Sequence, residues 1–197
     1  MAKDSRGKQT KGDIIRSAIH LFSLHGYFHT STNDILQATS VSKGAFYHHF
    51  KSKEDLALAV LDQVVEDYQQ MIGEPVMAVE DPGQRPMFML NRIVELNETG
   101  QWSNCLLLAR FAQEMTQHEG KLPEQVSSII NWMIGFWQQL IADAQAAGTV
   151  SRALQPRTLA ELVTGALFGA VGFRELEGKP FNLTKIADHV KMMIAAG

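Results

Sequence analysis

The sequence of 197 residues lacks what disulfide-bonded, metal-clustered and membrane-spanning proteins need. Its single cysteine excludes an internal disulfide and a multi-cysteine zinc site. The longest apolar run, at residues 162–173, is shorter than the roughly 18 residues that cross a bilayer. The charged N-terminus leads into no apolar segment of the kind found in secretory signals. These absences favour a soluble protein of the cytoplasm without a membrane partner.

Charge is small in total but unevenly distributed. Residues 1–53 carry eight Lys and Arg against three acids, a net charge of +5, whereas residues 54–197 carry ten basic and eighteen acidic side chains, a net charge of −8. Five of the seven histidines also fall in residues 1–53. A basic end on an acidic body indicates that this end binds a polyanion, and a solvated charged arm is the alternative interpretation.

Apolar residues recur at helical spacing throughout, and strand signals are scarce, so the sequence predicts an all-α fold. Ile14, Ile15, Ala18, Ile19 and Phe22 mark one face of a first helix that ends before Gly26. Short helices follow at 32–38, capped by Thr32, and at 43–50, capped by Ser42. Ser52 and Asp55 open a long helix that Gly73 and Pro75 end near residue 71. After a loop over residues 73–86, helices are expected at 86–99, 102–117, 123–147, 156–176 and 183–196.

Residues 32–50, TNDILQATSVSKGAFYHHF, match a helix-turn-helix in size and pattern. The apolar positions expected to hold the two helices together are Ile35, Ala38, Val41, Phe46 and Phe50, with small Ala38 allowing close approach. The second helix begins with short residues that can enter a major groove, followed by side chains that can bind phosphate oxygens: Ser42, Lys43, Gly44 and Ala45, then Tyr47, His48 and His49. Packing of Tyr47 on the first helix is the alternative, and at most one of the two histidines is expected to contact DNA.

Residues 11–61 resemble the DNA-binding domain of TetR-family repressors. The segment VSKGAFYHHFKSKEDL is the most specific part, and IIRSAIHLFSLHGYFHTST resembles the first helix of that family with its Gly-Tyr turn and threonine cap. By this resemblance, Thr32, Tyr47, His48 and Lys53 hold the phosphate backbone, while Ser42, Lys43, Gly44 and Ala45 approach base edges. Ser40 stands where the turn of this motif usually has glycine. If the turn needs a positive φ, serine costs about 1 kcal/mol there.

The resemblance implies a three-helix DNA-binding domain at 1–53 and a helical domain at 54–197 that binds an effector and dimerises through its last two long helices. Small residues three to four positions apart between 156 and 176 agree with close contact to a second chain: Gly165, Ala166, Gly169, Ala170 and Gly172. Packing within one chain is the alternative explanation.

Aromatic and methionine side chains concentrate in the middle of the chain, where they indicate either a core or a pocket for an apolar or aromatic effector. The candidate effector-binding residues are Phe88, Trp102, Cys105, Phe111, Met115, Trp132 and Phe136, with Arg92, Arg110 or Gln113 as a polar contact. The segment SNCLLLARFAQEM resembles a GCLL-type segment of a TetR subgroup that includes electrophile sensors, with Asn104 in place of the glycine. Cys105 is therefore either a sensor or a buried structural thiol.

The residues and the resemblance together favour a ligand-responsive homodimeric repressor that binds a palindromic operator in double-stranded DNA. A small helical enzyme or carrier without sequence-specific DNA binding is the rival, and a DNA-binding protein without an effector is a third possibility. We find no catalytic constellation, because Cys105 and His118 lack an orienting third group. His25 and His29 are separated by Gly26, which breaks the helix needed for metal-ligand spacing, so neither a metal nor another cofactor is expected.

Overall fold

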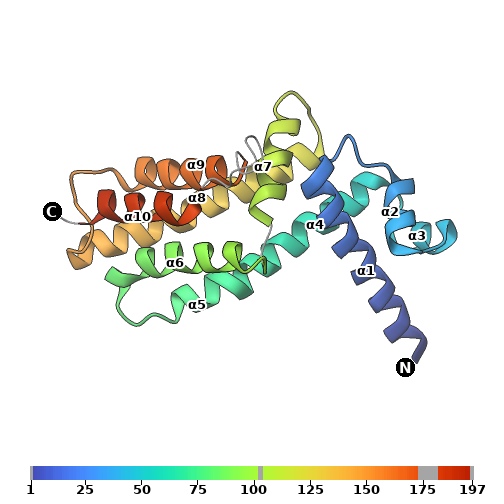
Figure 1. The fold of residues 1–197 in the computed structure, drawn as a ribbon, viewed down its shortest axis with the longest axis horizontal. Helices are drawn as coiled ribbons and strands as arrows, with labels where there is room; N and C mark the ends of the chain where they lie inside the picture. The colour runs from blue at the N-terminus through green and yellow to red at the C-terminus, as the bar shows by residue number, and fades with distance from the viewer. Residues whose placement is uncertain (1, 102–103, 173–181, 196–197) are drawn as a thin grey trace. The chain divides into compact units, whose positions relative to one another are not determined.

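The structure, a computed structural model, describes residues 2–101, 104–172 and 182–195. Its helices, shown in Figure 1, are α1 (Ala2–His25), α2 (Thr32–Thr39), α3 (Lys43–His49), α4 (Lys53–Tyr68), α5 (Glu74–Met77), α6 (Arg85–Glu98), α7 (Asn104–Met115), α8 (Lys121–Ala147), α9 (Pro156–Gly172) and α10 (Leu183–Ile194). A short π-helix, η1 (Gln69–Gly73), joins α4 to α5, and a 3₁₀ helix, η2 (Pro82–Gln84), precedes α6. No strand occurs within the described ranges, where Val150 and Ala195 form only an isolated bridge. The predicted all-α fold is confirmed.

The chain forms two compact units. The first contains Met1–Glu66 and Leu107–Ser127, and the second contains Asp67–Leu106 and Ser128–Gly197. The divisions fall inside α4, α7 and α8, so each of these helices contributes residues to both units. The predicted domain boundary at residue 53 remains a sequence-based prediction, while the first compact unit also includes 54–66 and 107–127.

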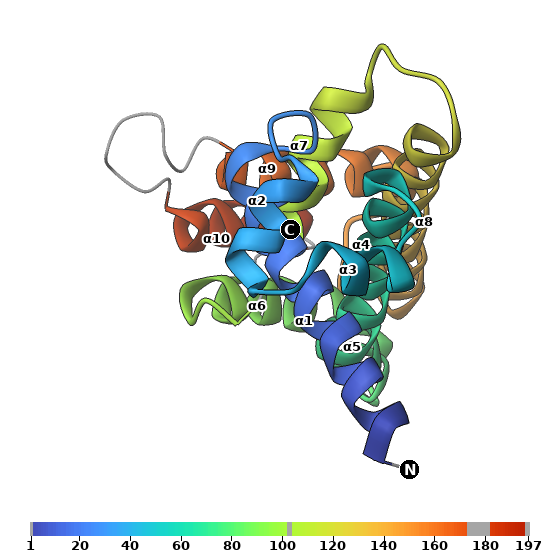
Figure 2. The ribbon, with the colours of Figure 1, turned by 90° about the vertical axis from the view of Figure 1, so that its right-hand side faces the viewer.

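The first unit is built on the helix-turn-helix and the helix before it. Figures 1 and 2 show α1, α2 and α3 grouped together. The predicted apolar face of α1 packs inward, with Ile14, Ala18 and Phe22 fully buried. The side chains that hold α2 and α3 are Ile35, Phe46 and Phe50, all of them buried. Ala38 is exposed, so its predicted place in this core is wrong: α2 turns Ile35 inward and Ala38 toward solvent.

Local hydrogen bonds define the ends of the short helices. Ser31, rather than Thr32, is the N-cap of α2, because Ser31 has an extended backbone and its hydroxyl accepts from the Asp34 amide at 3.2 Å. The Asp34 carboxylate in turn accepts from the Ser31 amide at 2.7 Å, which completes a capping box. The Ser31 hydroxyl also donates to the Asp34 carboxylate at 2.7 Å, and this bond, together with the one from the Ser31 amide, lowers the pKa of Asp34. Ser42 caps α3 as predicted, accepting from the Ala45 amide at 3.2 Å.

The turn between α2 and α3 does need a positive φ, at Ser40. Ser40 ends α2 in the left-handed region, with φ 54° and ψ 23°. It is the single described non-glycine residue with a positive φ. A Cβ makes this conformation unfavourable for L-residues, so Ser40 stores strain that glycine would not.

The second unit contains α6, α9, α10 and most of α8. Its buried side chains include Met89, Leu90 and Ile93 of α6, Leu140 and Ile141 of α8, Val163 of α9, and Ala187 and Val190 of α10. Side-chain to backbone bonds fix its turns: Thr149 donates to the Gly83 carbonyl at 2.9 Å, and Gln145 donates to the Ser151 and Leu154 carbonyls at 2.7 and 2.8 Å. The helices predicted at 86–99 and 123–147 are present, with ends that differ by a few residues. Those predicted at 102–117, 156–176 and 183–196 are present as α7, α9 and α10, and residues 102–103, 173–176 and 196 lie outside the described residues.

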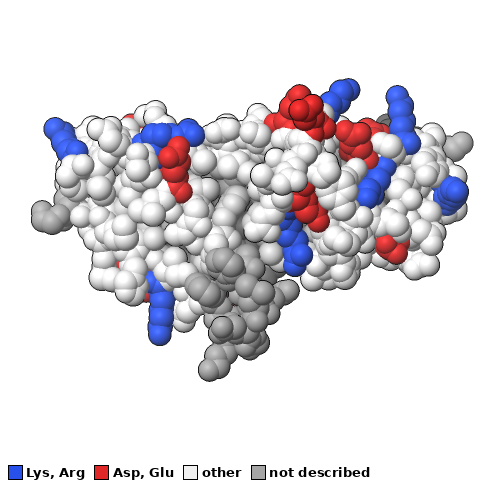
Figure 3. All heavy atoms as spheres, turned by 90° about the horizontal axis from the view of Figure 1, so that it is seen from above, with Lys and Arg blue, Asp and Glu red and all other residues white. Residues whose placement is uncertain are grey.

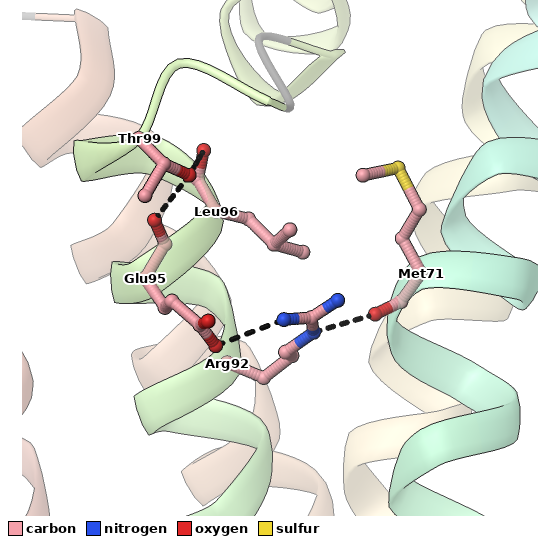
Figure 4. Close-up of polar contacts among 5 residues, drawn as sticks. All are labelled: Met71, Arg92, Glu95, Leu96 and Thr99. Atoms are coloured by element: carbon pink, nitrogen blue, oxygen red, sulfur yellow. Dashed lines mark hydrogen bonds and ion pairs between the residues drawn. The ribbon is translucent and has the colours of Figure 1, made fainter.

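The predicted end of the long helix at Gly73 and Pro75 is wrong, because the backbone stays helical through η1 and α5 to Met77. Proline has no N–H and leaves the carbonyl four residues before it, that of Met71, without its helical donor. Arg92 of α6 supplies one, donating from Nε to the Met71 oxygen at 3.0 Å (Figure 4). The Glu74 amide bonds to the Gln69 carbonyl five residues back, the π-helical pattern. A distant side chain thus replaces the missing donor.

Candidate nucleic-acid interface and effector pocket

The N-terminal end of α3 is the most open part of the helix-turn-helix. Ser42, Lys43 and Gly44 are exposed and Ala45 is half-buried. A Cβ added to Gly44 would meet no described atom within 4 Å. One turn further on, Phe46 is fully buried and fixes the helix to its own unit. The four residues predicted to approach base edges therefore lie together on a supported, accessible helix end.

The candidate phosphate-binding side chains of α3 lie next to this end. Tyr47 is 47% exposed, with its ring edge against Phe46 at a centroid distance of 5.2 Å. His48 is exposed and His49 is half-buried, so α3 presents His48 more openly to solvent than His49. Burial lowers the pKa of His49, and nearby His48 and Lys11 lower it further. Tyr47 and His48 are thus accessible to a phosphate, as α3 presents them.

The Lys53 side chain makes most of its contacts within the protein. Its ammonium donates to the Tyr27 carbonyl at 2.9 Å and to the Thr30 carbonyl at 3.0 Å, and it lies 4.2 Å from the centroid of the Tyr27 ring. Burial lowers the pKa of Lys53, while Glu114 acts in the opposite direction. An ammonium has three donors, so one remains for a phosphate. Thr32, the other predicted phosphate ligand, is half-buried at the first position of α2.

The head, which is residues 2–53 with α1, α2 and α3, has a structural partner that sequence reasoning missed. This partner is Glu114 of α7. Its carboxylate accepts from the Tyr27 amide at 2.7 Å, from 87 residues further along the chain. Gly26 makes this approach possible: its φ is +84°, and a Cβ there would lie 1.9 Å from the Glu114 carboxylate. No signal near Glu114 in the sequence points to this contact, because only the fold brings α7 to the turn after α1.

Lysine and arginine side chains do not form a broad basic surface on the face of the molecule that Figure 3 shows. Basic and acidic side chains are interspersed on it, and neither sign forms a continuous patch. On this face no large area suits a polyanion. The hypothesis of DNA binding therefore depends on α3 and the residues beside it.

A pocket of about 330 Å³ lies in the second unit. Its aromatic walls are Tyr68 of α4 and Trp132 and Phe136 of α8, and Gln69, Gly73, Glu74 and Met77 complete the lining. The Tyr68 ring meets Trp132 at 5.3 Å and Phe136 at 6.3 Å, edge to face in both pairs. Two of the predicted effector-binding residues, Trp132 and Phe136, are thus brought together.

Three of the other predicted effector-binding residues, Phe88, Phe111 and Met115, do not line this pocket. Phe111 and Met115 are buried in the first unit, where the Phe111 ring lies 5.6 Å from Phe22 and 5.9 Å from Tyr27. Phe88 is exposed on α6. Trp102 lies outside the described residues, and Cys105 belongs to α7 but its side chain is not among those described.

The predicted polar contacts are also elsewhere. Arg92 binds the Met71 carbonyl and pairs with Glu95 at 2.9 Å (Figure 4). Gln113 is exposed, and Arg110 is half-buried. Gln69 and Glu74 supply the polar side chains of the pocket instead.

No group of three or more metal-binding side chains occurs in the part of the chain that the structure describes. Across the same residues, no helix has the length and apolar character of a membrane span.

Comparisons with known proteins agree with this arrangement. Residues 14–60 match the family model "Bacterial regulatory proteins, tetR family", and residues 90–197 match "YsiA-like protein, C-terminal region". The chain is 26% identical over 171 residues to the transcriptional regulator AcuR of Cereibacter sphaeroides, covering 85% of this chain and 77% of AcuR. It is 28% identical over 159 residues to the HTH-type transcriptional repressor DhaR of a Mycobacterium species, covering 80% of this chain and 78% of DhaR. The crystal structure of AibR with isovaleryl coenzyme A and operator DNA has a TM-score of 0.76 at 20% identity, covering 94% of this chain and 98% of AibR.

The exposed start of α3 on a buried aromatic support, together with these matches, defines a DNA-binding transcriptional regulator of the helix-turn-helix class. The chain belongs to the TetR family.

Proposed function

We propose that the protein is a homodimeric repressor that binds a palindromic operator and releases it when a small molecule occupies the second unit. The exposed N-terminal end of α3, held from behind by Phe46, carries the proposal. In this role Ser42, Lys43, Gly44 and Ala45 contact base edges. Thr32, Tyr47, His48 and Lys53 contact phosphates. Repression is favoured by the relationship to DhaR, which is named as a repressor. The proposed repressor acts in the cytoplasm, where it binds its operator.

Dimerisation is proposed through α9 and α10. Leu162 of α9 is exposed, as are Met192 and Met193 of α10. Gly165 of α9 is exposed too, and a Cβ there would meet no described atom within 4 Å. Glycine costs about 1 kcal/mol within a helix. Packing inside the described chain does not account for that cost at Gly165, whereas close approach of a second chain does.

Effector response is proposed to act through α4. This helix begins at Lys53 in the first unit and reaches the pocket at Tyr68 in the second. A ligand that favours one conformation of the pocket end of α4 shifts the equilibrium between DNA-binding and released states. In the released state the two α3 helices of the dimer no longer match the half-site spacing. The relationship to AibR, whose structure holds both a coenzyme A ester and operator DNA, supports a regulator of this kind.

The test is selection of bound duplexes from a random DNA pool by the purified protein. We expect enrichment of a palindrome with half-sites about 34–36 Å apart, or somewhat more. Lys43→Ala should change the preferred bases, whereas Lys121→Ala, which removes an equal charge at the start of α8, should leave them unchanged. Failure of the folded protein to enrich any sequence at low salt would contradict the proposal and favour a helical enzyme or carrier.

A further inference from the structure

The pocket in the second unit has walls suited to a flat or bulky apolar group. Trp132 is partly exposed and Tyr68 is buried, and both rings line the pocket. Aromatic faces carry negative electrostatic potential and attract cations as well as apolar groups. The walls alone therefore accept an aromatic ligand and favour a positive charge over a negative one.

The charge of the lining residues also favours a cationic ligand over an anionic one. Glu74 is the single charged side chain among the described lining residues, and it is exposed. Within the described residues no lysine or arginine forms an ion pair with it. Arg92, the basic side chain bonded to the adjacent η1, is held by the Met71 carbonyl and Glu95. An anionic ligand would meet Glu74 with no compensating charge, whereas a cation would gain a partner.

Pocket size limits the ligand further. A volume of about 330 Å³ is at the lower end of the range of about 300–1,000 Å³ for small-molecule sites. It suits a compact molecule, with Gln69 available at the wall for one hydrogen bond.

We propose that the pocket binds a compact aromatic or bulky apolar cation, with its apolar body between Tyr68, Trp132 and Phe136 and its positive nitrogen toward Glu74. The proposal rests on the proposed function for its regulatory meaning, since such a cation would be the effector. Glu74 selects the charge of the ligand, and the aromatic residues supply most of the affinity.

The experiment is calorimetric titration of the full chain with three naphthalene probes of similar size: 2-naphthylmethylammonium, 2-naphthylmethanol and 2-naphthoate. We expect one site per chain and an order of affinity of cation, then neutral alcohol, then anion. Glu74→Gln should weaken cation binding about three- to fivefold, the effect of a solvent-exposed charge pair. It should leave the alcohol unaffected. Trp132→Leu should weaken both by about tenfold or less.

The matched control is Glu66→Gln, which removes the same charge from an exposed position on α4 outside the pocket. Absence of binding, equal or tighter binding of the anion, or a cation preference in Glu74→Gln as large as in the unaltered protein would overturn the proposal. Operator selection with the same unliganded protein tests the proposed function separately. A palindrome enriched by a protein that binds no cation would leave the repressor proposal intact and remove only this ligand class.

Discussion

The helix-turn-helix and the α4–η1–α5 segment differ in how the backbone groups at their helix ends and irregularities are hydrogen-bonded. In the head, Ser31, Ser42 and Ser52 each accept from an amide three residues later. At η1, the Met71 carbonyl depends on Arg92, 21 residues along the chain and on another helix. The shape of the DNA-reading element is therefore encoded locally, whereas the wall of the pocket depends on tertiary packing.

This difference predicts how the two regions respond to substitution. Within the head, changes to caps and turns should alter stability by small amounts, because each affects one or two local hydrogen bonds. The head also has two features that depend on more than its own sequence neighbours: its buried core and the contact between Gly26 and Glu114. Substitutions at these two features should have the largest effects on stability.

Phe46→Ala should reduce the free energy of unfolding by about 3–5 kcal/mol, because it empties a fully buried aromatic site between α3 and its unit. Tyr47→Ala is the matched change at the next residue, and we expect a cost below about 1 kcal/mol because Tyr47 is largely exposed. Denaturant unfolding measures both. Binding to a selected operator duplex should be weakened in Tyr47→Ala although the protein stays folded. Equal losses of stability in the two variants would contradict a buried Phe46 ring and an exposed Tyr47 ring.

Gly26→Ala should cost about 2 kcal/mol or more, because alanine is strained at φ +84° and its Cβ would displace the Glu114 carboxylate from the Tyr27 amide. Gly44→Ala is the control, since α3 is open there and alanine should stabilise the helix by about 0.5–1 kcal/mol. Thermal unfolding of both variants gives the comparison. In a Glu114→Ala background the cost of Gly26→Ala should fall to the backbone strain alone, and simple additivity of the two changes would contradict this contact.

Arg92→Met should destabilise the protein by about 1–2 kcal/mol, because the Met71 carbonyl loses a charged donor that Pro75 cannot replace. Arg157→Met, which removes an exposed arginine paired with Glu161, should cost about 0.5 kcal/mol or less. Hydrogen exchange of the amides in η1 and α5 provides a second readout. Unchanged protection there in Arg92→Met would mean that η1 is as locally determined as the head.

Ser40→Gly should stabilise the protein by about 0.5–1 kcal/mol, the smallest of these effects, by removing Cβ strain from a left-handed position. Ala38→Gly tests the same replacement two residues earlier, at an exposed right-handed position of α2, and should cost about 1 kcal/mol. The two variants should shift the denaturant midpoint in opposite directions. Shifts of the same sign would contradict the assigned turn geometry.

By itself the sequence determined the all-α class, the helix-turn-helix with its cap at Ser42, and the unusual serine at position 40. These features arise from periodicity, capping chemistry and a motif within a few residues, and such information is complete in a short segment. The same reasoning misplaced the α2 cap by one residue because Ser31 and Thr32 are both good caps, and only the backbone conformation distinguishes them.

Only the tertiary structure decided which aromatic residues lie together and what holds the irregular backbone. Trp132 and Phe136 meet Tyr68 at the pocket, while Phe111 packs with Phe22 and Tyr27 in the first unit. Every one of these rings has the same apolar character in the sequence, so periodicity cannot separate core from pocket. The helix likewise continues past Pro75, where Arg92 of α6 supplies a donor to the Met71 carbonyl. Contacts between residues far apart in the chain decided these features, and no local pattern records them.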